Sequence, residues 1–203
     1  MIKDDSKMLE ELENISANAF VSPAIKITIT GNGAVGKTSL CQQLTTGFIP
    51  GTYNLTVGCE IHTQKYAINN GEKNLSLVLW DLAGQDRFES IRDGFYSGSH
   101  ASLVVFDITS RGSFYDCNSW VRELKRNSPN TPFILVGNKS DKAGEDLREV
   151  GKDEALDLAK KFGVPYIETS AKKGINVNHV FQMAAKLALS HNNPKRDSRL
   201  MAY

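Results

Sequence analysis

The sequence predicts an α/β fold with one mostly parallel, six-stranded sheet, a single antiparallel hairpin strand, and helices on both faces. A β-branched strand at residues 25–30 runs directly into a glycine-rich turn and then an apolar helical pattern. Further along, short apolar strands alternate with amphipathic helices after one hairpin, which is typical of a parallel sheet. Polar motifs follow the strands, and ligands of such sheets lie beyond the carboxyl ends of the strands. We therefore expect a ligand site along that edge.

The glycine-rich turn has the composition of a phosphate-binding loop, Gly31-x4-Gly36-Lys37-Thr38. Glycines at 31, 33 and 36 let the backbone turn its N–H groups toward an anion. Lys37 can reach the β- and γ-phosphates, and the Thr38 hydroxyl can bind Mg²⁺. The N-terminus of the following helix adds partial positive charge. Because strand and helix flank the turn as this motif requires, we interpret it as a nucleotide-binding loop.

The rest of the chain divides into short elements. Residues 47–58 are rich in Gly, Pro, Asn and Thr, which predicts an exposed loop. A half-exposed strand at 60–68 and a buried strand at 75–80 flank hairpin chemistry at 69–71. The remaining predicted elements are strands at 101–106, 133–136 and 164–167, and helices at 113–126, 153–162 and 177–189. Gly163 marks the end of the second of these helices.

Two motifs at strand ends narrow the chemistry. Asp81 places a carboxylate where it can hold Mg²⁺ through water, and Gly84 places a backbone N–H near a γ-phosphate. Asn138-Lys139-x-Asp141 can recognise a base. A carboxylate accepts two N–H bonds from guanine, whereas adenine offers no such pair of donors.

A last motif, Ser170-Ala171-Lys172, can place a backbone N–H on the guanine oxygen. Together, the five motifs resemble those of the Ras-superfamily small GTPases, in the same order and over residues 25 to about 190. Residues 80–88 look like the Rab branch, whereas residues 57–62 and 92–96 look closer to Ran. The resemblance implies the P-loop NTPase (small GTPase) fold, GTP as substrate, GDP and phosphate as products, and Mg²⁺ as cofactor.

The resemblance also implies roles for individual residues. Gln85 would orient the attacking water, with Lys37 and Thr56 completing the catalytic set. Thr56 would bind Mg²⁺ only when a γ-phosphate is present, beside Thr38 and, through water, Asp81. The implied nucleotide-binding residues are Gly31, Gly33, Ala34, Val35, Gly36, Lys37, Thr38, Ser39, Tyr53, Thr56, Gly84, Asn138, Lys139, Asp141, Ser170, Ala171 and Lys172.

Some features depart from the family pattern. Relatives place an aromatic residue seven positions before the switch threonine, but Ile49 stands there, with Phe48 one position earlier. We therefore expect a shifted or weaker contact with the guanine edge. No arginine is evident at a phosphate-facing position, although Arg87 and Arg92 stay candidates. Otherwise an activating partner would supply that arginine. Asp107, at another strand end, is expected to cap the chain rather than bind a ligand.

The ends of the chain are expected to flank one GTPase domain at 25–190. Residues 1–24 carry a helical apolar stripe (Met8, Leu12, Ile15, Ala19), and packing on the domain or contact with a partner or membrane both stay open. Residues 191–203 are expected to be a flexible tail. The last cysteine is Cys117, so no prenyl anchor is expected there. The three cysteines are far apart and are expected to be reduced packing residues.

The composition of the chain limits which classes of partner we expect. A net charge of +1 over 203 residues gives no reason to expect nucleic acid, and no stretch of about 18 apolar residues predicts a membrane span. We expect a cytoplasmic monomer without a stable lipid anchor, which leaves transient membrane or nuclear association open. Expected protein partners are effectors, through residues 48–58 and 82–96, an exchange factor and a GTPase-activating protein.

Two rival functions stay open from the sequence alone. The first is a GTP-dependent interaction module with negligible hydrolysis. The second is an ATP-dependent kinase or ATPase, which residues 138–141 disfavour. The sequence also leaves open whether the role is in trafficking, as in Rab proteins, or in transport, as in Ran.

Overall fold

A six-stranded sheet forms the centre of the molecule. The computed structural model describes residues 24–51, 55–68, 73–144 and 146–191. The strands are β1 (Ala24–Thr30), β2 (Cys59–Ile68), β3 (Lys73–Leu82), β4 (Ala101–Asp107), β5 (Phe133–Asn138) and β6 (Tyr166–Glu168). They lie in the order β2-β3-β1-β4-β5-β6; β2 pairs antiparallel with β3, and the other neighbours are parallel. The predicted fold class is confirmed.

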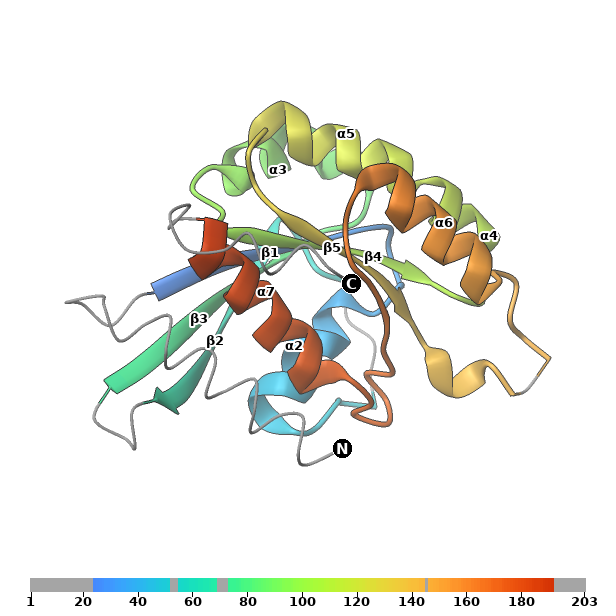
Figure 1. Cartoon of the computed structure of the whole chain (residues 1–203), viewed down its shortest axis with the longest axis horizontal. Helices are drawn as coiled ribbons and strands as arrows, with labels where there is room; N and C mark the ends of the chain where they lie inside the picture. The colour runs from blue at the N-terminus through green and yellow to red at the C-terminus, as the bar shows by residue number, and fades with distance from the viewer. Residues whose placement is uncertain (1–23, 52–54, 69–72, 145, 192–203) are drawn as a thin grey trace.

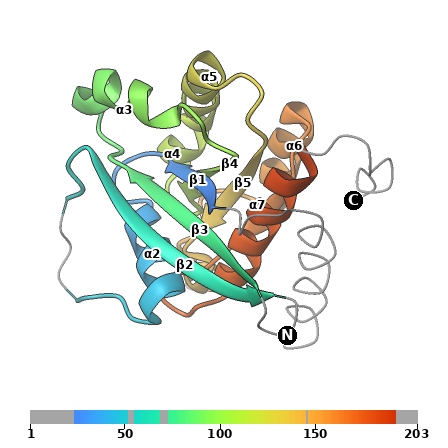
Figure 2. The same ribbon diagram turned by 90° about the vertical axis from the view of Figure 1, so that its left-hand side faces the viewer.

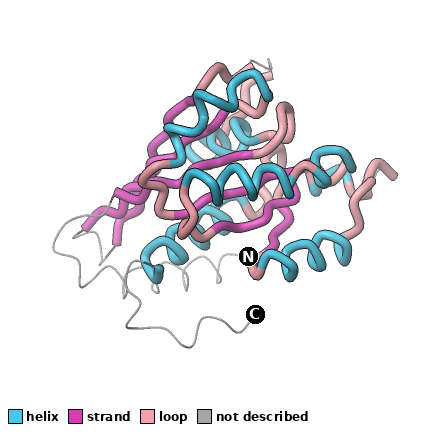
Figure 3. The backbone as a smooth tube through the Cα atoms, turned by 90° about the horizontal axis from the view of Figure 1, so that it is seen from above, coloured by secondary structure: helices cyan, strands magenta, loops and turns pink. Residues whose placement is uncertain are grey.

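Helices cover both faces of this sheet. Their bounds are α2 (Lys37–Thr46), α3 (Glu89–Tyr96), α4 (Arg111–Tyr115), α5 (Cys117–Asn127), α6 (Lys152–Phe162) and α7 (Val177–His191), with 3-10 turns η1 (Asp86–Phe88) and η2 (Ser140–Lys142). Helices α2 and α7 lie on one face and α3 to α6 on the other (Figure 1). Figure 2 shows the long β2–β3 hairpin crossing in front of α2, and Figure 3 shows the strands running among the helices.

The interior is two apolar clusters separated by the sheet. One joins β1, β3 and β4 to α2 and α7, and contains Leu40, Cys41 and Phe181. The other joins β4 and β5 to α4, α5 and α6, and contains Phe106 and Trp120. All seven residues of β4 are buried, as are all six of β5, which is the pattern of parallel strands covered on both faces. This rigid centre fixes where the loops leave the sheet.

Local differences from the sequence prediction have identifiable causes. The helix predicted at 113–126 is two helices, because α4 begins after the cap residue Ser110 and the chain turns at Asp116 before α5. Helix α3 was not predicted. The last strand begins at Tyr166 rather than at residue 164. The apolar stripe of residues 1–24, the turn at 69–71, Tyr53 and most of the tail lie outside the described residues.

Candidate functional site

The phosphate loop follows β1 in a backbone conformation that requires glycine at two positions. Gly31 has φ +138°, and a side chain there would collide with the carbonyl oxygen of Val105 on β4. Gly36 has φ +97°, and a side chain there would collide with the amide of Asn138. Gly33 does not have a positive φ, whereas the next residue, Ala34, is left-handed with φ 64°. The loop is therefore held against β4 on one side and β5 on the other.

Lys37 lies buried at the first turn of α2 and closes this loop on itself. Its ammonium donates to the carbonyl oxygens of Gly31 and Asn32, at 2.7 Å each. Burial lowers the pKa of Lys37 to about 8, while the nearby Asp81 carboxylate acts in the opposite direction. An anion beside this ammonium would raise the pKa again, since an opposite charge favours the charged form. The site is thus electrostatically suited to a phosphate.

Three oxygen-bearing side chains from separate segments converge next to Lys37. The Thr38 hydroxyl donates to Asp81 Oδ2 at 2.5 Å, and its oxygen lies 2.9 Å from the Thr56 hydroxyl. Thr56 Oγ1 is also 3.4 Å from the same carboxylate oxygen. Asp81 is fully buried, and its Oδ1 has no hydrogen-bond partner among the described residues. This set of oxygen donors with an orphaned carboxylate oxygen fits Mg²⁺, which prefers such hard ligands.

The loop after β3 passes directly over the phosphate loop. A side chain at Gly84 would collide with backbone atoms of Gly31 and Asn32 and with the Lys37 ammonium. Gly84 is therefore a position where close approach of two backbones excludes every other residue. Gln85 follows, half-buried, at the start of η1. Its carbonyl oxygen accepts a hydrogen bond from the Arg92 guanidinium at 2.7 Å.

Asn138, at the end of β5, connects the phosphate loop to the loop after β6. Its side-chain amide donates to the carbonyl oxygen of Val35 at 2.9 Å. Its Oδ1 accepts from the Thr169 hydroxyl at 3.1 Å and from the Ala171 N–H at 3.2 Å. That N–H of the Ser170-Ala171-Lys172 motif is therefore engaged by Asn138 itself. Asn138 therefore links the phosphate loop to the loop after β6, in addition to the role on the base that the sequence predicts for it.

The neighbouring motif residues are also held in place. The Ser170 hydroxyl donates to Asp141 Oδ1 at 2.5 Å. Lys139 adopts a left-handed backbone, with φ 67°, and its ammonium lies 2.6 Å from Asp107 Oδ2. Asp107 Oδ1 accepts from the backbone N–H and the hydroxyl of Thr109. The expectation that Asp107 caps the chain agrees with these bonds, and its second oxygen also positions Lys139.

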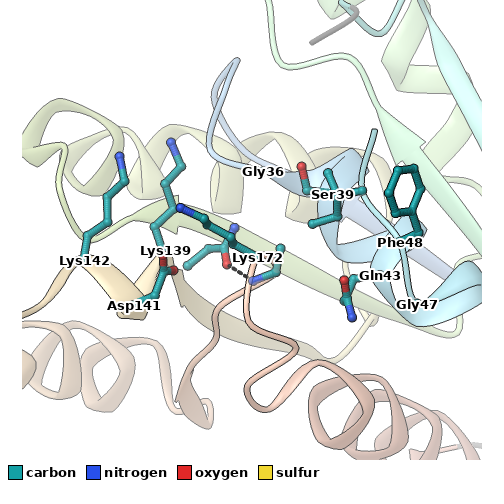
Figure 4. Close-up of a pocket in the computed structure, with 12 residues that line it drawn as sticks. Gly36, Ser39, Gln43, Gly47, Phe48, Lys139, Asp141, Lys142 and Lys172 are labelled. Atoms are coloured by element: carbon teal, nitrogen blue, oxygen red, sulfur yellow. Dashed lines mark hydrogen bonds between the residues drawn. The ribbon is translucent and has the colours of Figure 1, made fainter. Parts of the chain in front are cut away.

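A cavity of about 470 Å³ opens between the phosphate loop, η2 and the loop after β6. Figure 4 shows Lys139, Asp141, Lys142 and Lys172 on one side of it and Phe48 on the other. Its lining residues are Gly36, Ser39, Gln43, Gly47, Phe48, Ile49, Asn138, Lys139, Asp141, Lys142, Ala171 and Lys172. Gln43 and Lys142 were not predicted to line it. Their place follows from the turn of α2 and from η2, which no local sequence signal indicated.

Phe48 and Ile49 both line this cavity, but their surroundings differ. Phe48 is 66% exposed, so its ring covers the rim without being fixed in the core. Ile49 packs partly against the core cluster on the α2 and α7 side of the sheet. Relatives place an aromatic residue at the position of Ile49; in this chain an aromatic ring lines the cavity one residue earlier, at Phe48.

The two candidate arginines, Arg87 and Arg92, have different surroundings. Arg92 is 2% exposed and forms a two-pronged ion pair with Glu123, with both N–O distances 2.8 Å. Hydrogen bonding to Glu123 raises the pKa of Arg92 against the opposing effect of its burial. Arg87 is exposed, with its guanidinium 4.8 Å from the centre of the Phe88 ring. The guanidinium of Arg92 is therefore engaged by Glu123 and by the backbone of the loop after β3.

Most of the predicted site residues come together at this edge of the sheet. The phosphate loop, Thr38, Thr56, Asp81 and Gly84 form one group, and the residues of the Asn138 and Ser170 motifs form the other. Tyr53 lies outside the described residues. Within those residues, no helix is long and apolar enough to cross a lipid bilayer. A parallel sheet with this loop at the end of β1 defines a P-loop nucleotide-binding protein.

Comparison with known proteins narrows this class. The family model described as "Ras family" matches residues 26–190. The Ypt/Rab-type GTPase ypt7 of Schizosaccharomyces pombe is 39% identical over 173 residues, covering 82% of this chain and 83% of the relative. The Ras-related protein Rab7 of Cenchrus ciliaris is 38% identical over 179 residues, covering 85% of each chain. The Ras-related protein Rab-27A of Mus musculus is 36% identical over 176 residues, covering 81% of this chain and 78% of the relative.

The chain therefore belongs to the Ras family of small GTPases, and these relatives place it in the Rab branch. Members of this family bind GTP and GDP and act with regulators and effectors. The Rab-like half of the resemblance seen in the sequence is confirmed.

Replacing Gly84 by alanine should separate the loop after β3 from the phosphate loop, because the added methyl group has no room there. We expect faster amide hydrogen exchange across residues 82–88 in nucleotide-loaded protein. Gly94→Ala, in α3, is the matched control, since a side chain there meets only open space. Equal exchange in Gly84→Ala and wild type would show that the two backbones do not need this contact.

Proposed function

We propose that this chain is a Rab-type GTPase switch in which Mg²⁺ and the γ-phosphate hold residues 48–58 and 82–96 in order, and GTP hydrolysis releases them. The observation that carries the proposal is the convergence of Thr38, Thr56 and Asp81. These residues come from α2, the loop before β2 and the end of β3. These contacts form only when all three segments are in place, so binding or loss of a ligand at this point would affect all three segments together.

Thr38, Thr56 and, through water, Asp81 would hold the metal ion. When bound, Mg²⁺ supplies positive charge that neutralises the phosphate oxygens. Thr38 gives its only hydroxyl proton to Asp81, so its lone pairs face Thr56 and any cation beside it. Thr56 would tie the switch segment to the site, because its neighbours Leu55 and Val57 are both exposed.

Lys37 and Gln85 would carry the chemistry on the γ-phosphate. The Lys37 ammonium is already fixed by two backbone carbonyls, so it can offset developing charge without rearranging. The N–H of Gly84 would approach the γ-phosphate, since its backbone lies against the phosphate loop and Lys37. Gln85 would align the attacking water for in-line displacement.

The cavity beside the loop would take the guanine base. The Asp141 carboxylate would accept the two N–H bonds of guanine, with Ser170 holding one of its oxygens. Lys139 would pack on the base from the position that Asp107 gives it. Because the Ala171 N–H is engaged by Asn138, the N–H of Lys172 would face the guanine oxygen from the loop after β6.

Residues 48–58 and 82–96, the two switch segments, carry exposed apolar side chains that support a role in binding protein partners. Leu55, Val57 and Ile91 are each at least half exposed, at 54%, 71% and 50%. Apolar groups that cluster on a nucleotide-sensitive surface are typical of effector and regulator contacts. An exchange factor and an activating protein would act here. An arginine from the latter typically adds about 10³–10⁵ in rate.

The proposed GTPase domain is residues 25–190, with residues 1–24 as an extension and 191–203 as a tail. We propose that the protein acts as a monomer in the cytoplasm.

The alternative function is that of an interaction module with negligible hydrolysis. The Ypt/Rab-type GTPase relatives favour the hydrolytic function over this alternative.

Single-turnover hydrolysis of bound GTP separates the two functions. We expect wild type to hydrolyse GTP with Mg²⁺ and Gln85→Leu to lose at least about tenfold in rate, because an apolar side chain cannot align water. Nucleotide affinity should stay near the wild-type value. Equal rates for the two proteins would remove Gln85 from catalysis, and binding of ATP more tightly than GTP would overturn the assignment of the base site.

Phe48→Ala should speed dissociation of bound GDP by about tenfold, because contact with an aromatic ring typically contributes about 1–3 kcal/mol per base. Fluorescent GDP displaced by excess unlabelled GDP measures this rate. Leu55→Ala is the control, since Leu55 is an exposed apolar residue of the same loop outside the cavity. If Phe48→Ala and Leu55→Ala dissociate GDP equally fast, Phe48 does not cover the base.

A further inference from the structure

Arg92 is a buried arginine that has no part in the proposed reaction at the phosphates. It lies on α3 and reaches toward α5, where its Nε and Nη2 donate to the two carboxylate oxygens of Glu123. Its remaining guanidinium nitrogen, Nη1, donates to two backbone carbonyl oxygens, those of Ala83 at 3.1 Å and Gln85 at 2.7 Å. A single side chain thus fixes the backbone on both sides of Gly84.

The guanidinium of Arg92 lies over the indole ring of Trp120, a residue of α5. The distance from the guanidinium carbon to the ring centre is 4.5 Å, a cation–π contact in a buried place. The indole Nε1 of the same residue donates to the side-chain oxygen of Asn32 at 2.5 Å. One aromatic side chain therefore contacts both the phosphate loop and the residue that holds the backbone of Gln85.

Asn32 is held by hydrogen bonds from both its side chain and its backbone. Its side-chain amide donates to Asp116 at 2.6 Å, at the junction of α4 and α5. Its backbone carbonyl accepts from the Lys37 ammonium at 2.7 Å. A shift of Lys37 or of the loop would therefore reach Trp120 through one intervening residue.

A second connection starts on the other side of Gly31. The Tyr96 hydroxyl donates to Glu123 at 2.9 Å, so its single proton is used there. The Thr30 hydroxyl, at the end of β1, must then donate to the Tyr96 oxygen, 2.8 Å away. Thr30 and Asn32, on the two sides of Gly31, are thus each linked through one aromatic residue to the ion pair of Arg92 with Glu123.

We propose that Arg92 and Trp120 are positioning residues that couple the phosphate loop to the backbone of Gln85, so that a bound triphosphate sets the place of the catalytic glutamine. This inference rests on the proposed GTPase function. Arg92 does not contact the phosphates; it acts through Gln85. Trp120 acts through Asn32 on one side and Arg92 on the other.

Two conservative variants test the coupling in full-length protein loaded with GTP and Mg²⁺. Trp120→Phe keeps an aromatic ring under Arg92 but removes the N–H donated to Asn32. Arg92→Lys keeps the charge beside Glu123 but cannot hold Glu123 and both carbonyls together. We expect each to slow single-turnover hydrolysis by about tenfold, since small displacements of a reacting group have effects of this size or larger. GTP affinity should stay within about twofold of wild type.

Matched controls are the other tryptophan and a neighbouring arginine. Trp80→Phe alters a residue packed on Phe95 and Lys26, and Arg122→Lys alters an exposed residue of α5. Both should hydrolyse GTP at the wild-type rate within about twofold. The melting temperature of each variant reports any general loss of stability.

The deciding measurement combines each variant with Gln85→Leu. If Arg92 and Trp120 act through Gln85, adding Trp120→Phe or Arg92→Lys to Gln85→Leu should slow hydrolysis no further. A further loss of the same factor in the double variant, or a wild-type rate in either single variant, would overturn the positioning role. A wild-type rate in Gln85→Leu alone would instead contradict the proposed function.

Discussion

Asn138 bonds at once to the loop that would hold the phosphates and to the loop that would hold the base. Its amide donates to Val35 and its carbonyl oxygen accepts from Thr169 and Ala171. The phosphate loop passes so close that only glycine fits at Gly36. Losing this side chain would leave buried backbone groups unpaired, which typically costs about 1–3 kcal/mol for each. The spacing between the two halves of the nucleotide site therefore depends on one residue at the end of β5.

The movable part of the site is built differently from this fixed part. The central strands β4 and β5 are buried throughout, so the loops at their ends start from a rigid base. Thr56 meets Thr38 and Asp81 through hydroxyl and carboxylate groups alone, on a loop with exposed apolar side chains. Such contacts are weak without a ligand and strong around a cation and a phosphate. The energy that orders the switch segments would thus come from the nucleotide rather than from packing.

Sequence alone predicted the sheet, its hairpin and the residues at its carboxyl edge, because strand periodicity and the glycine-rich motif are local signals. It did not predict α3, the break at Asp116 or the place of Arg92. Arg92 is buried only because Glu123 and Trp120, about thirty residues away, supply its partners. The sequence predicted a shifted or weaker contact with the guanine edge, and only the fold shows that Phe48 and Ile49 both line the cavity.

Amide hydrogen exchange of protein loaded with GDP, compared with protein loaded with a non-hydrolysable GTP analogue and Mg²⁺, tests the central claim most directly. We expect slower exchange in residues 55–58 and 82–96 with the triphosphate analogue. We expect no difference in β4 and β5, because all of their residues are buried. Identical exchange of those two segments with diphosphate and triphosphate would contradict it.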